Sequence, residues 1–392
     1  MKPHAWGTAV RRFPTFLCDM ATTTLIFLGR EGLGEIEQWV AGGRIAAMRD
    51  AVQLTMTLPQ AARVVVAAPE PELEEQHPDL PVIWDFDAPS QSFHFGQRLA
   101  ALMDGYPSDV FVYLGAGSLP LLPRDVLAQA VEEVACATTP LAITNNLHSS
   151  DWIVLNCPEA VRSRPHRLER DNALGWVLTN EASVEVRGLN PSAATRVDID
   201  TPADLLALSL HPRTGPELSA YLRAHPQDTS RWRAAGKKLF TPASQIALIG
   251  RVASGVWAYV EAHTQVWIRV FSEERGMAAS GRQNSGRVRS FVGAHLARVG
   301  AEAFFAELSQ MVEAVFFDTR VVLAHHRLWP SAADRYASDL GLADRIQDSF
   351  LREFTAAAVN APIPIVLGGH GVVSGGLYAL VEIAEAGVLG KG

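Results

Sequence analysis

Cysteine is scarce in this sequence. The 392 residues include three cysteines, Cys18, Cys136 and Cys157, which lie far apart and form no CxxC pair. Thiols that are so few and so scattered predict neither a disulfide framework nor a zinc site.

Long apolar runs are lacking as well. The apolar stretch from Phe13 to Leu28 is interrupted by Asp19 and by a run of threonines. A membrane-spanning helix needs roughly 20 consecutive apolar residues, and no segment offers them. We therefore expect a cytoplasmic protein with no membrane partner.

An excess of positive charge is missing too, because the formal net charge is −8. A nucleic-acid surface needs clustered cations to replace the counterions of the phosphates, so no nucleic-acid partner is expected. A local anion pocket stays compatible with this charge. Hydrophobic residues make up 48% and charged residues 19% of the chain, which predicts a large core and a globular protein. The length favours two domains.

Residues 1–210 are predicted to form an α/β domain. Apolar, β-branched segments alternate with segments of helical periodicity, which predicts a mostly parallel sheet with helices on both faces. The expected strands are Thr22–Leu28, Ala62–Ala68, Pro81–Trp84, Asp109–Leu114, Leu141–Thr144, Trp152–Leu155 and Arg196–Ile199. A helix over Pro202–Leu210 is expected to close the domain.

The rest of the chain has a different pattern. Residues 211–240 are rich in Pro, Arg, Gly and Ser, which predicts a linker or a polar helix between the halves. In residues 241–392, long segments such as Ala243–Phe271 and Ala301–Val322 carry apolar residues at intervals of three and four. We therefore expect a mainly α-helical second domain, with one strand at Pro364–Leu367.

Two acidic residues mark the end of the first domain. Asp198 and Asp200 stand at the end of a predicted strand, before a helix with Thr201 as its cap and Pro202 at its first position. Side chains alternate along a strand, so both carboxylates should point the same way. Open α/β sheets bind ligands at this edge. Two roles stay open for these residues, Mg²⁺ binding or a helix cap alone.

This segment, Asp198-Ile199-Asp200-Thr201-Pro202-Ala203-Asp204-Leu205, and the order of the elements resemble a known superfamily over residues 21–210. It is the nucleotide-diphospho-sugar transferase superfamily, with the molybdenum-cofactor and phospholactate guanylyltransferases. The resemblance implies the fold of that superfamily, an NTP substrate and catalysis by Asp198 and Asp200 with Mg²⁺ as cofactor. Where the family has a metal-binding Asp before a Leu-Pro-Leu-Leu stretch, this chain has Ser118, whose hydroxyl is a poor substitute for a carboxylate with Mg²⁺.

A glycine-rich loop follows the first strand and is the expected site of the triphosphate. Its candidates are Gly29, Arg30, Gly32 and Gly34. The loop lacks the Arg-Met and Lys arrangement of the family, and Arg30, Arg44 and Arg49 are the candidates to meet the phosphates. An ordinary strand-to-helix turn is the alternative reading of these glycines.

Two more candidates lie in the second domain. Arg282 belongs to a glycine- and arginine-rich loop over residues 280–287, which is either an oxyanion cradle or a solvent loop. His370 follows the predicted strand within a glycine-rich turn. It is either an acid, base or ligand at an anion site or a structural histidine. For Asp318, Arg320 and the neighbouring charged residues, structural ion pairs are expected.

The leading hypothesis is an NTP-dependent nucleotidyltransferase that acts on a small anionic acceptor. One alternative is a non-catalytic nucleotide-binding or scaffolding module. Another places separate catalysis in the second domain around Arg282, Asp318 and His370. The oligomeric state stays open, and a homo-oligomer is possible.

Overall fold

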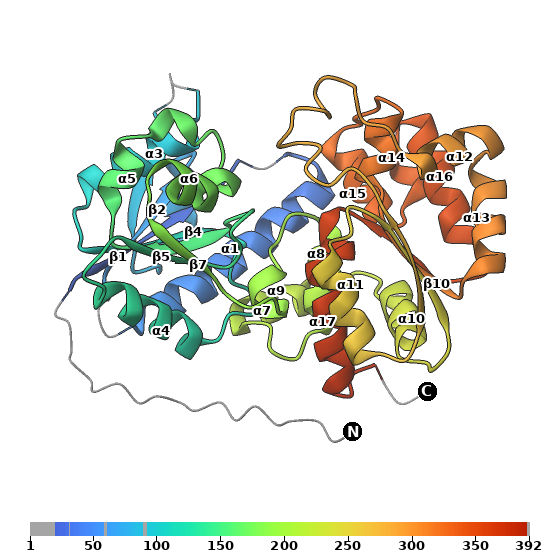
Figure 1. The fold of residues 1–392 in the computed structure, drawn as a ribbon, viewed down its shortest axis with the longest axis horizontal. Helices are drawn as coiled ribbons and strands as arrows, with labels where there is room; N and C mark the ends of the chain where they lie inside the picture. The colour runs from blue at the N-terminus through green and yellow to red at the C-terminus, as the bar shows by residue number, and fades with distance from the viewer. Residues whose placement is uncertain (1–19, 31, 59–60, 89–91, 390–392) are drawn as a thin grey trace.

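The computed structural model describes residues 20–30, 32–58, 61–88 and 92–389. Figure 1 shows two α/β halves side by side, the first in blue and green and the second in yellow to red, with α8 (Pro202–Leu210) and α17 (Gly375–Glu385) at their junction. Cys18 lies outside these ranges, and Cys136 and Cys157 are free thiols. No helix in the described ranges is long and apolar enough to cross a membrane.

The first half is built on a seven-stranded sheet with the order β3-β2-β1-β4-β6-β5-β7. Among its strands as described, β6 alone runs antiparallel, which confirms the mostly parallel α/β fold. The strands are β1 (Thr22–Phe27), β2 (Ala61–Ala68), β3 (Ile83–Phe86), β4 (Val110–Gly115), β5 (Leu141–Thr144), β6 (Trp152–Leu155) and β7 (Glu185–Gly188).

Helices cover both faces of this sheet, because its strands are apolar at successive positions. Leu25 packs in the cluster on the α3 face, whereas its neighbour Ile26 packs in the cluster that includes α1 and α4. The helices are α1 (Glu35–Met56), α2 (Glu72–Gln76), α3 (Phe95–Gly105), α4 (Arg124–Ala135), α5 (Pro158–Arg162), α6 (Leu174–Glu181) and α7 (Ala193–Arg196), with 3₁₀ turns η1 (Pro165–Arg167) and η2 (Asp171–Ala173).

The chain leaves β1 for β2 on one side and reaches β4 on the other. Parallel sheets bind ligands outside the carboxyl ends of strands at such a reversal. The loops after β1 and β4 meet there, because the Ala116 amide donates to the Phe27 carbonyl over 2.9 Å. The fold therefore positions a crevice between the carboxyl ends of β1 and β4.

The region between the halves is folded rather than extended. Helix α8 covers the residues predicted for it, and residues 211–240 form α9 (Pro216–Ala224) and α10 (Ser230–Leu239). Tyr221 on α9 donates its hydroxyl to the Trp39 carbonyl on α1 over 2.8 Å. Trp232 on α10 packs against Phe316 of the second sheet. The expected linker thus joins the halves as two packed helices.

The second half contains a four-stranded parallel sheet with the order β11-β10-β8-β9. Its strands are β8 (Gln245–Gly250), β9 (Trp267–Ser272), β10 (Ala314–Asp318) and β11 (Ile365–Gly368). Its helices are α11 (Ser254–His263), α12 (Phe291–Val299), α13 (Ala301–Met311), α14 (Arg320–His325), α15 (Ala332–Asp339), α16 (Ser349–Asn360) and α17, with 3₁₀ turns η3 (Ala343–Arg345) and η4 (His370–Val373).

The sequence prediction for this half was incomplete. Helices hold most of its ordered residues, but the sheet was missed except for β11. The segments expected as continuous helices, 243–271 and 301–322, each break into helix and strand. Strands β8 and β10 are buried on both faces, so they lack the alternation that identifies a half-exposed strand.

Gly250 at the end of β8 allows a close approach to β10. Its φ is +117°, and a Cβ there would lie 2.5 Å from the Cβ of Asp318. We expect G250A to lower the free energy of unfolding by about 2 kcal/mol or more, from backbone strain and overpacking. Urea denaturation followed by circular dichroism measures the change.

G255A is the matched control, because Gly255 lies on α11 and a Cβ there would meet nothing within 4 Å. Alanine favours helix over glycine, so G255A should be neutral or stabilising by up to about 1 kcal/mol. Equal stability of the two variants would contradict the tight β8 to β10 contact.

Candidate active site

The segment with Asp198 and Asp200 runs beside the loop that follows β4. The Ile199 amide donates to the Gly117 carbonyl over 3.1 Å. A Cβ on Gly117 would lie 2.9 Å from the Cβ of Ile199, so the approach needs a residue without a side chain. The predicted strand at Arg196–Ile199 is wrong: α7 ends at Arg196, and the extended residues after it belong to no sheet.

Arg44 on α1 holds this segment from the other side. Its Nε donates to the Ile199 carbonyl over 2.7 Å, and its Nη2 donates to the Asp200 carbonyl over 3.1 Å. The guanidinium therefore fixes the backbone that carries Asp198 and Asp200. Its expected contact with phosphates stays a prediction.

Negative charge accumulates at this crevice. Burial raises the pKa of Asp198 well above its usual range, and the charges of Asp200 and Asp151 raise it further. Asp151 precedes the antiparallel strand β6, which places it at the carboxyl edge of the parallel strands. Burial raises its pKa to about 7, although Asn145 opposes the shift by donating to its carboxylate over 2.6 Å.

These carboxylates are the candidates for a metal. Within the described part of the chain, no three His, Cys, Asp or Glu side chains converge on one metal position. Asp198 and Asp200 nevertheless suit Mg²⁺, which usually takes one or two protein carboxylates and completes its shell with water and phosphate oxygens. A divalent cation would also relieve the repulsion that raises the pKa of Asp198.

Ser118 does not replace the missing acid of the family motif. The residue is buried, and its hydroxyl donates to the Gly115 carbonyl over 2.8 Å. That bond closes the turn after β4.

The glycine-rich loop after β1 is partly occupied by the protein itself. Gly34 precedes α1, and its amide donates to Glu37 over 3.0 Å. A Cβ on Gly32 would collide with the same carboxylate. Gly29 and Arg30 are exposed, and Arg30 lies 3.9 Å from Glu70. Glu37 therefore covers the helix N-terminus at which a phosphate was expected.

The start of α8 confirms the predicted helix cap. The amides of Asp200 and Thr201 donate to Oδ2 of Asp204 over 3.1 and 2.7 Å, and the Thr201 hydroxyl donates over 2.8 Å. Burial raises the pKa of Asp204 to about 7, and the charge of Asp200 adds to the effect. The hydrogen bonds from Thr201 lower the pKa of Asp204 and oppose this increase.

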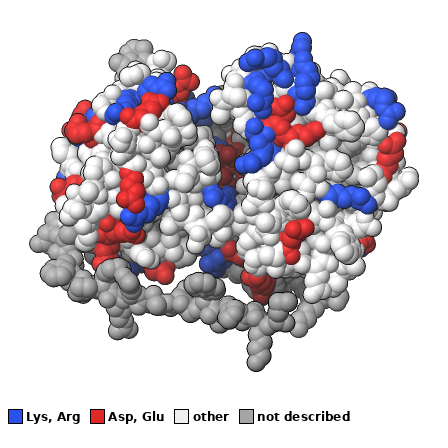
Figure 2. Space-filling model, in the orientation of Figure 1, with Lys and Arg blue, Asp and Glu red and all other residues white. Residues whose placement is uncertain are grey.

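The carboxyl end of β11 packs directly on this cap. A Cβ on Gly371 would lie 1.9 Å from Oδ1 of Asp204, and one on Gly369 would lie 3.1 Å from Cγ2 of Thr201. His370 stands between these two glycines. Figure 2 shows a hollow between the halves, with acidic side chains inside it and arginine or lysine side chains at its rim.

His370 connects the two halves electrostatically. Desolvation lowers the pKa of its imidazole, and the charge of Arg251 lowers it further. The charges of Asp318 and Asp200 act in the opposite direction. The charges that act on His370 therefore come from both halves.

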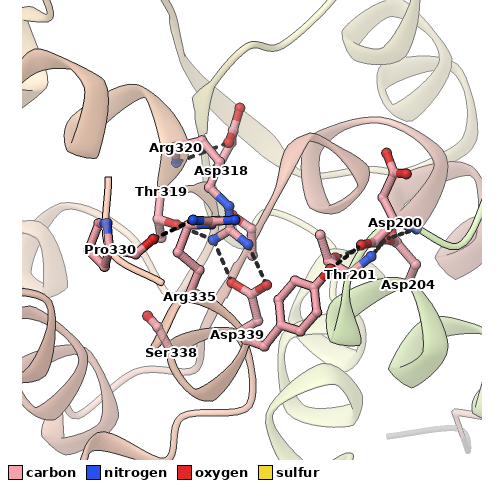
Figure 3. A network of polar contacts seen from close by, with 12 residues as sticks. Asp200, Thr201, Asp204, Asp318, Thr319, Arg320, Pro330, Arg335, Ser338 and Asp339 are labelled. Atoms are coloured by element: carbon pink, nitrogen blue, oxygen red, sulfur yellow. Dashed lines mark hydrogen bonds and ion pairs between the residues drawn. The ribbon is translucent and has the colours of Figure 1, made fainter. Parts of the chain in front are cut away.

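Ion pairs support this arrangement from the second half, as expected for Asp318 and Arg320. Arg320 donates to both carboxylate oxygens of Asp339 over 2.7 and 2.6 Å. Arg251 donates to Oδ2 of Asp318 over 2.6 Å. Figure 3 shows Asp318, Arg320 and Asp339 facing Asp200, Thr201 and Asp204 across the junction. Tyr336 bridges the junction by donating to the Asp200 carbonyl over 3.0 Å.

The chain is similar to solved nucleotidyltransferase structures. One, from Desulfovibrio desulfuricans G20 and assigned as a nucleotide-diphospho-sugar transferase, shares 19% identity with a TM-score of 0.39, covering 52% of this chain and 94% of its own. A cytidylyltransferase from Leptospira borgpetersenii serovar Hardjo-bovis shares 15% identity with a TM-score of 0.37. The match covers 53% of this chain and 94% of the cytidylyltransferase. CMP:2-keto-3-deoxy-manno-octonic acid synthetase with CTP shares 11% identity with a TM-score of 0.32. The match covers 43% of this chain and 89% of the synthetase. The sequence matches no protein-family model and no curated protein.

The structure brings Asp198, Asp200, Arg44 and His370 to one junction. Arg282 lies in the loop after β9, where its Nε donates to Glu274 over 2.9 Å. Sequence reasoning missed Arg251 and Tyr336. Arg251 had one usable signal, because it follows an apolar run that ends in glycine.

The buried cap predicts a pH effect on stability. The folded-state pKa of Asp204, about 7, lies above the usual aspartate value of 3.8. The folded state therefore binds more protons between these values, so stability falls as the pH rises through this window. D204N keeps an oxygen acceptor without the charge. We expect wild type to lose stability relative to D204N from about pH 4 to 7, by at most about 1.4 kcal/mol per pH unit.

Urea denaturation at several pH values measures this difference. E75Q is the control for the loss of one negative charge, because Glu75 is exposed on α2. A stability difference between wild type and D204N that does not change with pH would refute the raised pKa.

Proposed function

We propose that the protein transfers a nucleotidyl group from an NTP to a small anionic acceptor in the hollow between its halves. One observation carries the proposal: Arg44 and Gly117 fix Asp198 and Asp200 beside the crevice between β1 and β4. Nucleotidyl transfer needs carboxylates at such a position, because the reacting phosphates concentrate negative charge.

Asp198 and Asp200 would hold Mg²⁺ in this proposal. The bound ion supplies charge neutralisation at the phosphates as pyrophosphate leaves. Asp151 adds to the negative field that attracts the ion, since its charge also acts on Asp198. The exposed part of the loop after β1, with Gly29 and Arg30, lies beside the same crevice and is assigned to the triphosphate.

His370 is assigned to the acceptor. A hydroxyl oxygen of the acceptor forms a bond to the α-phosphorus, the bond from that phosphorus to the pyrophosphate oxygen breaks, and His370 accepts the hydroxyl proton. The lowered pKa of His370 suits this role, because a base must be unprotonated to accept. In this proposal His370 and Asp200 belong to one active site. The second half then needs no catalytic site of its own.

The test is Mg²⁺-dependent release of pyrophosphate from CTP or GTP with a panel of hydroxy acids and their phosphates. We expect D200N to lower turnover by about a hundredfold or more, because the ion loses one of two carboxylate ligands. A pyrophosphate-coupled assay measures the rate, and circular dichroism confirms the fold.

D125N is the control variant, since Asp125 is exposed on α4 and D125N removes the same charge. Its turnover should stay within about twofold of wild type, the range of a surface substitution. Full activity of D200N would refute the role of the acidic pair.

A non-catalytic nucleotide-binding module is the second candidate, and one observation favours it. Ser118 uses its hydroxyl to close its own turn, so this position provides no acid. This candidate predicts that CTP or GTP raises the melting temperature while no pyrophosphate is released.

A further inference from the structure

The second sheet has a topological reversal of its own. From β8 the chain passes to β9 on one side and later to β10 on the other. The crevice at the carboxyl ends of β8 and β10 is therefore a second position at which an open parallel sheet binds ligands. Gly250 and Arg251 lie at the end of β8, and Asp318 lies at the end of β10.

Four arginines lie within residues 273–290, although the whole chain is acidic with a net charge of −8. The loop after β9, residues 273–290, begins at the crevice, because the Glu273 amide donates to the Gly250 carbonyl over 2.9 Å. We call the following set the arginine edge: Arg251, Arg275, Arg282, Arg287, Arg289 and Arg327. The hollow in Figure 2 has blue side chains along its rim on the second half.

Most of these guanidinium groups lack an acidic partner. Arg251 pairs with Asp318 and Arg282 pairs with Glu274. As far as the chain is described, the remaining four form no ion pair with a carboxylate. The other acid of the loop, Glu273, is committed to α12, because it accepts from the Phe291 amide over 2.6 Å and from the Ser290 hydroxyl.

The loop is fixed in place rather than free in solvent. Met277 and Val288 are buried in a small cluster with Val321 and Ala324 of α14. The Ser290 amide donates to Nδ1 of His325 over 3.1 Å. Arg327 follows α14, and a Cβ on Gly286 would lie 3.4 Å from its Nε. The loop that carries the arginines is thus held against α14 by packing.

We propose that the arginine edge binds the oxyanion of a small phosphate- or carboxylate-bearing ligand, with the crevice between β8 and β10 as its floor. Guanidinium groups bind both anions through paired hydrogen bonds. The charges of Arg251, Asp318 and Asp200 all act on His370. The assignment of this ligand as the acceptor rests on the proposed function, whereas the anion site itself does not.

Titration calorimetry with 2-phosphoglycolate tests the site, with inorganic phosphate and glycolate as separate arms that identify the anion bound. We expect R275Q/R287Q to raise the dissociation constant by about tenfold or more. R298Q/R352Q is the matched control, because both arginines are exposed on α12 and α16 and the net charge changes equally. The control should change the constant by less than about threefold, through long-range screening alone.

A second variant examines the floor. R251Q/D318N removes the ion pair without leaving a buried charge, and it should weaken 2-phosphoglycolate binding by about tenfold as well. Wild type that binds none of the three probes would overturn the proposal. Equal weakening by R275Q/R287Q and R298Q/R352Q would overturn it too, because net charge alone would then explain binding.

The variant D200N distinguishes the anion site from the proposed nucleotide site. Retained 2-phosphoglycolate binding in D200N, together with its loss in R275Q/R287Q, supports the anion site even where no nucleotidyl transfer is found. Loss of 2-phosphoglycolate binding in D200N, with unchanged binding in R275Q/R287Q, would place the probe at the acidic pair and overturn the inference.

Discussion

The contact between the cap of α8 and the glycines after β11 determines the relative position of the two sheets. Asp204 is a buried carboxylate that accepts three hydrogen bonds from Asp200 and Thr201. Its other oxygen lies where a side chain on Gly371 would be. A buried carboxylate is costly unless it is hydrogen-bonded, so the backbone around it has little freedom. The position of Asp200 follows from this constraint.

The acidic pair is consequently held from three directions. Arg44 reaches it from α1, Gly117 from the loop after β4, and Tyr336 from α15. Helix α15 is itself anchored by the buried pair of Arg320 and Asp339. Loss of either partner would leave an uncompensated buried charge. The ion pair of Arg320 and Asp339 therefore positions α15 more than it stabilises the fold. A hydrophobic cluster that runs from the first sheet through α8 and α17 to β10 supports the same junction.

Local sequence patterns predicted those strands and helices that depend on neighbouring residues alone. The strand cores in Thr22–Leu28 and Ala62–Ala68 and the exact span of α8 were predicted, because apolar runs and a capping box are visible in the sequence. The second sheet was missed because β8 and β10 are apolar on both faces and short. The site depends on contacts between distant residues, such as Arg44 with Ile199, and no local pattern encodes them.

The charges on the two sides of the hollow explain why it can stay open. Acids that belong to the first half and arginines that belong to the second would attract one another, and free contact between them would close the space. The acids Asp318 and Glu274 of the second wall are instead neutralised within that wall, by Arg251 and Arg282. Asp198 keeps a raised pKa because it is buried and because the charges of Asp200 and Asp151 act on it. Each wall therefore retains a surplus of its own sign, which suits a cation on the first half and an anion on the second.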